Sequence, residues 1–228
     1  MQLTFREIEK VFEVEEKTLY RWLNTEKMPT IKANDQYYFN PIEVLEWALK
    51  KRIVLTPGAL KLCERECQGK DIFTSALIRG GIHFGVQGNS REEILEKILD
   101  FLPLPNHIQR PFLKEMLLSR EQMGTTALGD GIAIPHIKHP VVLAGMEPMV
   151  GLFFLESPID FAAFDHKKVH TLFVILSASF KEHLSLLSRM AFCLQREDLK
   201  LQLSHYKTKE EILAAFQVVE SRIVGASE

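Results

Sequence analysis

The sequence has few cysteines, no long apolar run and almost no net charge, and each of these absences excludes a class of protein. Its three cysteines are an odd number without a Cys-x-x-Cys pair, which argues against a disulfide framework and a thiolate zinc site. The longest apolar run, about ten residues around positions 172–178, is too short to span a bilayer. A net charge of -2 provides no overall field that would attract nucleic acid or a membrane.

Targeting and nucleotide-binding signals are also missing. The first five residues lack a basic region followed by an apolar core, so we expect no signal peptide and a cytoplasmic protein. No Gly-x-x-x-x-Gly-Lys-Ser/Thr loop occurs, and the glycines at 80–81 and 85–88 read as turns. The 228 residues, with an ordinary apolar fraction of 46%, suffice for two small domains or one large one.

Residues 1–53 have the pattern of a small, mainly helical domain. Thr4-x-x-Glu7 is a capping box that predicts a helix start, and Asn40-Pro41-x-Glu43 predicts another. Residues 31–39 predict a short hairpin that turns at Asn34-Asp35. The predicted order is helix, turn, helix, small wing, helix.

This order resembles the winged helix-turn-helix domains of the excisionase and MerR-like group. The resemblance rests on Val14-x-x-Lys17-Thr18-Leu19-Tyr20-Arg21-Trp22-Leu23 and on Asn40-Pro41-Ile42-x-x-x-Leu45-x-Trp47. It implies DNA binding, and the candidate residues are Lys17, Thr18, Tyr20, Arg21, Lys27 and Lys32. Nine basic residues are balanced by nine acidic ones in this segment, so a helical protein-interaction or dimerisation module, and with it a homodimer, remains an alternative.

The remaining sequence predicts a linker and a larger domain. Residues 54–71, broken by Pro57-Gly58, read as the linker, with a short helix over 59–67. Residues 72–224 alternate between helical and strand-like patterns, which predicts an α/β domain with a mixed sheet flanked by helices. The helices are expected from Ser90, from Pro111, over 182–194 and from Thr208, and the strands over 131–134, 150–155 and 169–178.

The most informative stretch is Gly129-Asp130-Gly131-Ile132-Ala133-Ile134-Pro135-His136. Its glycines permit unusual backbone angles, and Pro135 fixes its own φ and favours an extended Ile134. His136 is therefore expected on a rigid backbone at the end of a strand. A histidine is largely neutral and nucleophilic at physiological pH, so His136 suits a phosphoryl acceptor, a general base or a metal ligand.

Several separated motifs resemble the enzyme IIA domain of the bacterial phosphoenolpyruvate-dependent phosphotransferase system, in its fructose/mannitol/nitrogen-regulatory class. They are the octapeptide above, Arg120-Glu121-x-Met123-Gly124-Thr125-Thr126, Ser157-Pro158-Ile159-x-Phe161, Val169-x-x-Leu172-Phe173 and His183-Leu184-x-x-Leu187-Ser188. The resemblance implies that His136 accepts a phosphoryl group and that Arg120 and His183 support the phosphate. It also implies a histidine-containing phosphocarrier protein as donor.

Physical chemistry makes these roles reasonable without a metal or a cofactor. A guanidinium such as that of Arg120 binds two oxygens of a phosphoryl group at once. His183 is expected near a helix start, where free N–H groups and the helix dipole favour an anion. Arg120 as a surface cation, and His183 as a partly buried helix residue, remain alternatives.

A metal site is the competing chemistry for the histidines. The spacings His136-x-x-His139 and His166-x-x-x-His170 are those of metal ligands. The second pair would share a face only in a helix, whereas residues 165–168 read as a turn before a strand. A metal-dependent enzyme is therefore the weaker reading.

The motifs together predict a regulatory phosphocarrier whose charge state controls a second module. No membrane sugar-transport domain occurs in the sequence, which favours regulation over transport. Two alternatives are a sugar-transport IIA component and a DNA-binding regulator whose IIA-like domain only senses and is not phosphorylated.

Overall fold

A computed structural model describes residues 2–56, 72–138, 143, 145–203 and 208–225. The chain divides into two compact units, residues 71–183 and residues 1–70 with 184–228. Helix α8 (Phe180–Leu194) begins in the first of these and continues in the second. The expected linker over 54–71 lies largely outside the described residues, so the domain boundaries proposed from the sequence stay predictions.

The unit of residues 71–183 is built on a five-stranded mixed sheet. The strand order is β4-β7-β8-β6-β5, in which β4–β7 and β6–β8 are parallel and the other two pairs antiparallel. The strands are β4 (Ile82–Val86), β5 (Ala127–Gly129), β6 (Ile132–Ala133), β7 (Met149–Ile159) and β8 (Val169–Leu176). The helices are α5 (Ile72–Gly80), α6 (Arg91–Phe101) and α7 (Arg110–Gln122).

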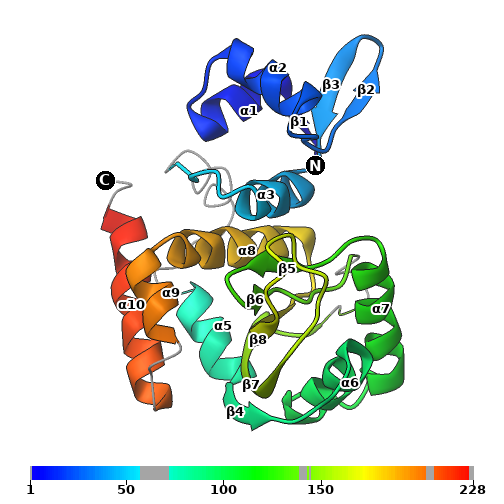
Figure 1. Ribbon diagram of the computed structural model, residues 1–228, viewed down its shortest axis with the longest axis vertical. Coiled ribbons are helices and arrows are strands. Elements are labelled where there is room, and N and C mark those ends of the chain that lie inside the picture. The colour runs from blue at the N-terminus through cyan, green and yellow to red at the C-terminus, as the bar shows by residue number, and fades with distance from the viewer. Residues whose placement is uncertain (1, 57–71, 139–142, 144, 204–207, 226–228) are drawn as a thin grey trace. The chain divides into compact units, whose positions relative to one another are not determined.

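One apolar core joins this sheet to α6 and α7, which lie together on one side of it (Figure 1). Leu95 and Ile98 of α6 and Leu113 of α7 are buried in the same cluster as Phe153 of β7 and Leu172 of β8. Each such side chain contributes about 1.5–3 kcal/mol by leaving water. Helix α7 is therefore held firmly at the sheet, and its last turn, which carries Arg120, has a fixed position.

The other unit contains the first part of the chain. Its elements are β1 (Leu3–Thr4), α1 (Phe5–Phe12), α2 (Glu16–Asn24), β2 (Ile31–Ala33), β3 (Gln36–Phe39) and α3 (Pro41–Lys50). The capping box at Thr4 and Glu7 is present, and the Asn40 side chain caps α3 by accepting from the Ile42 N–H at 3.0 Å. Strands β2 and β3 form the expected hairpin, with Asn34 and Asp35 both at positive φ.

Helices α9 (Glu197–Leu203) and α10 (Lys209–Gly225) belong to the same unit. Thr208 and Glu211 exchange hydrogen bonds at 3.2 Å and so form the expected capping box of α10. Arg189 of α8 and Glu220 of α10 form an ion pair at 3.0 Å, with side chains only 3% and 0% exposed. This pair ties α8 to α10.

The structure corrects several expectations from the sequence. Gly85, read as part of a turn, lies within β4 at φ 66°, where the register with β7 shifts. Strand β6 covers only Ile132–Ala133 of the expected 131–134, and β5, β1, α5 and α9 were not expected at all. The expected helix over 59–67 lies outside the described residues. In the part of the chain that the structure describes, no helix is both long and apolar enough to cross a membrane.

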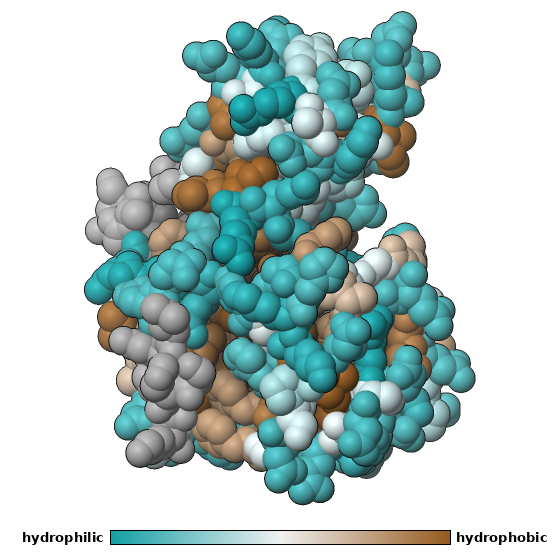
Figure 2. Space-filling view, viewed as in Figure 1, coloured by the Kyte–Doolittle hydropathy of each residue, from teal (hydrophilic) through white to brown (hydrophobic). Residues whose placement is uncertain are grey.

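The surface is largely hydrophilic. On the face that Figure 2 shows, apolar residues form small patches among charged and polar ones. The most exposed large apolar side chains of the described residues are Phe164 (74%) and Val54 (73%). Scattered apolar residues of this kind are ordinary on a protein surface.

Candidate functional site

The backbone that carries His136 is fixed on both sides. The turn between β5 and β6 has Gly129, Asp130 and Gly131 all at positive φ. A Cβ on Gly131 would lie 2.3 Å from the His170 ring, so the turn requires glycine there. The Ile134 N–H then donates to the Thr126 carbonyl at 3.1 Å. These contacts hold the segment that leads into His136.

Beyond Pro135, the chain continues beside β8. The Ile175 N–H donates to the Pro135 carbonyl at 3.1 Å, and His136 forms an isolated parallel bridge with Ile175. The prediction of a histidine on a rigid backbone just after a strand is therefore confirmed. The ring itself is buried, at 3% exposure.

The two ring nitrogens of His136 have different partners. Nδ1 lies 2.8 Å from the Ile134 carbonyl oxygen, which can only accept, so Nδ1 carries the proton. The Arg120 Nε–H donates to Nε2 at 3.1 Å, so Nε2 presents its lone pair. Both bonds specify one tautomer, and that tautomer leaves Nε2 as the nucleophilic atom.

Arg120 lies in the last turn of α7 and is buried, at 9% exposure. Besides its bond to His136, its guanidinium donates from Nη1 to the Gly124 carbonyl at 2.9 Å. The reading of Arg120 as a surface cation is therefore wrong. Two hydrogen bonds orient its planar group toward the reactive nitrogen of His136.

His183 lies in the first turns of α8, and its ring centroid is 5.0 Å from that of His136. Ser179 and Glu182 cap this helix start: Ser179 Oγ accepts from the Glu182 N–H at 3.2 Å, and Glu182 Oε2 accepts from the Ser179 N–H at 3.0 Å. The Ser177 hydroxyl lies 3.4 Å from His183 Nδ1. Arg120, His136 and His183 are spread over 63 positions of the sequence, and the structure brings their side chains together.

Comparison with known proteins now decides the family. The family described as "Phosphoenolpyruvate-dependent sugar phosphotransferase system, EIIA 2" matches residues 77–218, which is more than half of the chain. The chain belongs to the EIIA 2 family. This is a family of phosphocarriers of the phosphotransferase type, and its match includes all three site residues.

Relatives within this family include nitrogen regulatory proteins and fructose-specific components. The chain is 37% identical to the "Nitrogen regulatory protein" of Pseudomonas aeruginosa over 139 residues, 59% of this chain and 85% of that protein. It is 27% identical to the "PTS system fructose-specific EIIABC component" of Bacillus subtilis over 143 residues, 61% of this chain but 22% of that protein. The solved structure of nitrogen regulatory protein IIA-Ntr from Neisseria meningitidis is similar at a TM-score of 0.56 and 26% identity, covering 63% of this chain and 97% of that one.

Sequence reasoning missed two residues that shape this EIIA 2 site. The sequence motifs assign no role to Glu121, yet its buried carboxylate accepts from the Thr126 N–H and hydroxyl beside the site. Ser177, buried at the end of β8, contacts His183. A glutamate next to Arg120 on an otherwise apolar helix face was a usable signal, whereas Ser177 gave none.

The metal reading has no support among the described residues. No three His, Cys, Asp or Glu side chains within that part of the chain are grouped to hold a metal ion. His166 precedes β8 and His170 lies in it, so their spacing does not put them on one helix face. His139 lies outside the described residues.

Residues 1–76 lie outside the EIIA 2 match, and the DNA-binding candidates are all in this part. Lys17, Tyr20 and Arg21 are exposed on α2, whereas Thr18 is partly buried. Lys27 is exposed in the loop after α2 at φ 56°.

The hairpin lies beside α2 through a contact between aromatic rings. The Tyr20 ring of α2 is 6.3 Å from that of Tyr37 in β3, and Lys32 of β2 lies 5.8 Å from the Tyr37 ring centroid. Lys32 also pairs with Asp35 at 3.1 Å, which offsets part of its charge. The candidates on α2 and on the hairpin therefore share one neighbourhood.

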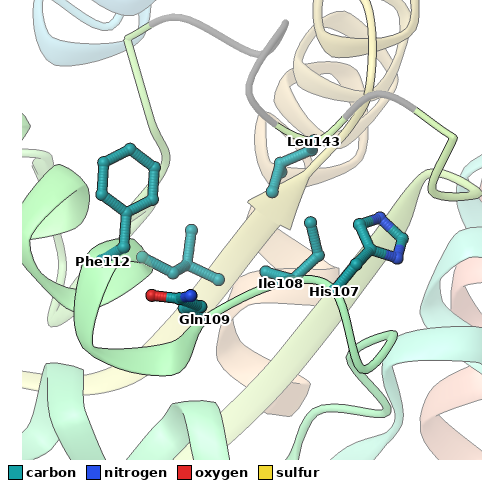
Figure 3. Close-up of a pocket in the computed structure, with 6 residues that line it drawn as sticks. His107, Ile108, Gln109, Phe112 and Leu143 are labelled. Atoms are coloured by element: carbon teal, nitrogen blue, oxygen red, sulfur yellow. The ribbon is translucent and has the colours of Figure 1, made fainter.

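A separate cavity of about 280 Å³ lies at the start of α7 (Figure 3). It is lined by His107, Ile108, Gln109, Phe112, Leu113 and Leu143. None of these described residues belongs to the group formed by Arg120, His136 and His183. The cavity has no part in the chemistry proposed below.

Proposed function

We propose that this protein accepts a phosphoryl group on Nε2 of His136 from a histidine-containing phosphocarrier protein. One observation carries the proposal: the bonds from Nδ1 to Ile134 and from Arg120 to Nε2 select the tautomer whose Nε2 lone pair faces a guanidinium. Phosphoryl transfer needs mainly positioning and charge stabilisation, and this arrangement supplies both.

The transfer balances with the groups at the site. The Nε2 lone pair forms a bond to phosphorus while the phosphorus–nitrogen bond of the donor breaks, and the donor imidazole keeps that electron pair. The proton of His136 stays on Nδ1 and continues to donate to the Ile134 carbonyl, so the phosphorylated ring carries a positive charge next to the anionic phosphoryl group. Arg120 then donates to phosphoryl oxygens, since Nε2 no longer accepts. His183 supports the same group from the start of α8.

Because the His136 ring is buried, a donor reaches Nε2 only when neighbouring side chains move aside. Arg120 bonds directly to Nε2 and is one of the groups that must turn. The free-energy cost of this rotation is small, because the guanidinium exchanges its hydrogen bond to His136 Nε2 for one to a more negative phosphoryl oxygen.

Incubation with radiolabelled phosphoenolpyruvate and the general phosphotransfer proteins tests the acceptor. We expect wild type to take up acid-labile phosphate, His136→Ala to take up none, and the control His107→Ala to behave as wild type. Equal labelling of His136→Ala and wild type would show that His136 is not the phosphoryl acceptor. Absence of labelling in wild type would instead favour a IIA-like domain that only senses.

We infer a regulatory role for the carrier because identity to a nitrogen regulatory protein reaches 37% over 139 residues, whereas identity to the fructose-specific components is 32% and 27%. The test is onward transfer to a sugar-specific IIB component. A regulatory carrier keeps its phosphate under these conditions, whereas rapid, complete loss to the IIB component would establish a sugar-transport role.

We also propose that residues 1–53 bind DNA through α2 and the β2–β3 hairpin. The exposed Lys17 and Arg21 on α2 and the adjoining Lys32 support this, because phosphate contacts from such side chains supply most of non-specific affinity. Electrophoretic mobility shifts with Arg21→Ala test it, with Lys51→Ala, whose ammonium pairs with Glu26 at 2.9 Å, as the control of equal charge change. If wild type retards no DNA at low salt, residues 1–53 are a protein-interaction module.

A further inference from the structure

Glu121, the neighbour of Arg120, places a buried carboxylate beside the phosphoryl site. Its side chain is 3% exposed. Both carboxylate oxygens lie within hydrogen-bond distance of the Thr126 N–H, at 3.1 and 3.2 Å, and Oε2 accepts from the Thr126 hydroxyl at 2.6 Å. Burying a carboxylate costs several kcal/mol unless such partners satisfy it, so the whole arrangement depends on Thr126 staying in place.

Arg91 and Phe161 complete a ring of contacts around the segment 124–126. Nη1 of Arg91, at the start of α6, lies 3.6 Å from Glu121 Oε1, and the Arg91 guanidinium carbon lies 5.3 Å from the Phe161 ring centroid. The Phe161 carbonyl in turn accepts from the Thr125 hydroxyl. The end of α7, the start of α6 and the loop after β7 therefore converge on this segment.

The same segment holds both groups of the phosphoryl site. The Thr126 carbonyl accepts from the Ile134 N–H at 3.1 Å, and the Ile134 carbonyl accepts from His136 Nδ1 at 2.8 Å. The Gly124 carbonyl accepts from Arg120 at 2.9 Å. A shift of segment 124–126 would therefore move the proton acceptor of His136 and the anchor of Arg120 together.

We infer that Glu121 is a positioning residue of the phosphoryl site, whose carboxylate holds segment 124–126 so that His136 keeps its proton on Nδ1 and Arg120 faces Nε2. The effect on phosphoryl uptake rests on the function proposed above. The effect on the His136 tautomer does not, because it needs no donor. A merely structural glutamate would change stability but neither the tautomer nor the uptake of the folded fraction.

Glu121→Gln, with nitrogen-15-labelled histidine, tests the inference. The glutamine amide nitrogen puts a donor where one carboxylate oxygen accepts from Thr126, so segment 124–126 loses part of the hydrogen bonding that holds it. We expect the nitrogen-15 spectrum of His136 to change from a single Nδ1–H tautomer to a mixture, and phosphoryl uptake to slow roughly 10- to 100-fold, as for a misplaced reacting group. Glu115→Gln, at an exposed position of the same helix, should leave both unchanged.

Thr126→Val is the second variant, and it decides the question if Glu121→Gln does not fold. Valine matches threonine in shape but removes the hydroxyl bond to Glu121, and Thr126→Ser restores it. The inference holds if Thr126→Val shifts the tautomer and Thr126→Ser does not. It is overturned if the folded variants keep the wild-type tautomer, or if uptake falls only in proportion to the unfolded fraction. A wild-type protein that takes up no phosphate but shows a Glu121-dependent tautomer would refute the proposed function alone.

Discussion

Arg120 acts at His136 through the shape of its side chain as well as through its charge. Its guanidinium donates from Nη1 to the Gly124 carbonyl and from Nε to His136 Nε2, a geometry that a lysine does not reproduce because its donors share one nitrogen. We expect Arg120→Lys to slow phosphoryl uptake by about 10- to 100-fold although the charge is kept. Rapid-quench measurement of labelled phosphate checks this, with Arg79→Lys on α5 as control. Unchanged uptake would mean that only the positive charge matters.

Cys193 is a buried thiol that should not react in the folded protein. Burial raises its pKa far above the ordinary thiol range, and the nearby Glu220 carboxylate raises it further. Because the thiolate is the reactive form, we expect no modification by an aromatic disulfide reagent at about pH 8 until the protein is unfolded. The measurement uses a Cys63→Ser, Cys67→Ser background so that only Cys193 is counted. Rapid modification under native conditions would contradict the burial.

His170 should make the unit of residues 71–183 less stable in mild acid. Burial lowers its pKa in the folded state, so the unfolded chain binds more protons as the pH falls through the ordinary histidine range. The free energy of unfolding therefore rises with pH across the interval just below that range and levels off above it. Urea titrations between about pH 5 and 7.5 should show a smaller rise for His170→Asn than for wild type. Parallel curves would assign the pH dependence to other groups.

At the scale of elements, helices with local start signals and the β2–β3 hairpin were predictable, whereas the short strands β1 and β5 were not. Ser90, Thr208 and Asn40 each cap a helix by bonds to residues two or three positions away, so the sequence contains all that is needed. Strands β5 and β6 have only three and two residues. They form because β6 pairs with β8 and β5 pairs with β6. A pattern that short carries no period of its own, which is why β5 and β1 were missed; β4 was missed because Gly85 was read as part of a turn.

The candidate site divides in the same way. His136 was predictable because glycines and a proline fix its backbone locally. The link from Glu121 through Thr126 and Ile134 to His136 was not, because it depends on two hydrogen bonds across a turn that only the folded chain forms. Motif resemblance supplied Arg120 and His183, and the roles of the residues behind them follow from tertiary contacts.

Removal of one partner of the ion pair between α8 and α10 should strongly destabilise their unit, because it leaves one charge buried. Glu220→Gln removes the negative charge that pairs with the Arg189 guanidinium, whose side chain is only 3% exposed. We expect the free energy of unfolding, measured by urea titration, to fall by about 3–5 kcal/mol. The double variant Arg189→Met, Glu220→Leu should lose less, because no buried charge remains. Asp198→Asn, which breaks the exposed pair with Arg196, should cost under about 1 kcal/mol. Equal losses for the buried and exposed pairs would refute this account.

At the scale of the whole molecule, the chain joins an EIIA 2 match over residues 77–218 to a segment with exposed basic residues on α2. The net charge of the chain is only -2, so one added phosphoryl group changes it by a large fraction. Under the function proposed above, this change in charge would give the phosphoryl group a use besides onward transfer.

We expect phosphorylation of His136 to weaken DNA binding by the full chain. The phosphoryl group makes the chain more negative, which opposes its binding to the DNA phosphates through an interaction that salt screens. Mobility shifts at about 50 mM salt should show a roughly 2- to 5-fold weaker affinity after treatment with phosphoenolpyruvate and the transfer proteins, and a smaller change at about 200 mM salt. His136→Ala should show no change at either salt. An equal change in wild type and His136→Ala would trace the effect to the added proteins, and tighter binding of the phosphorylated form would show that the coupling acts through conformation and not through charge.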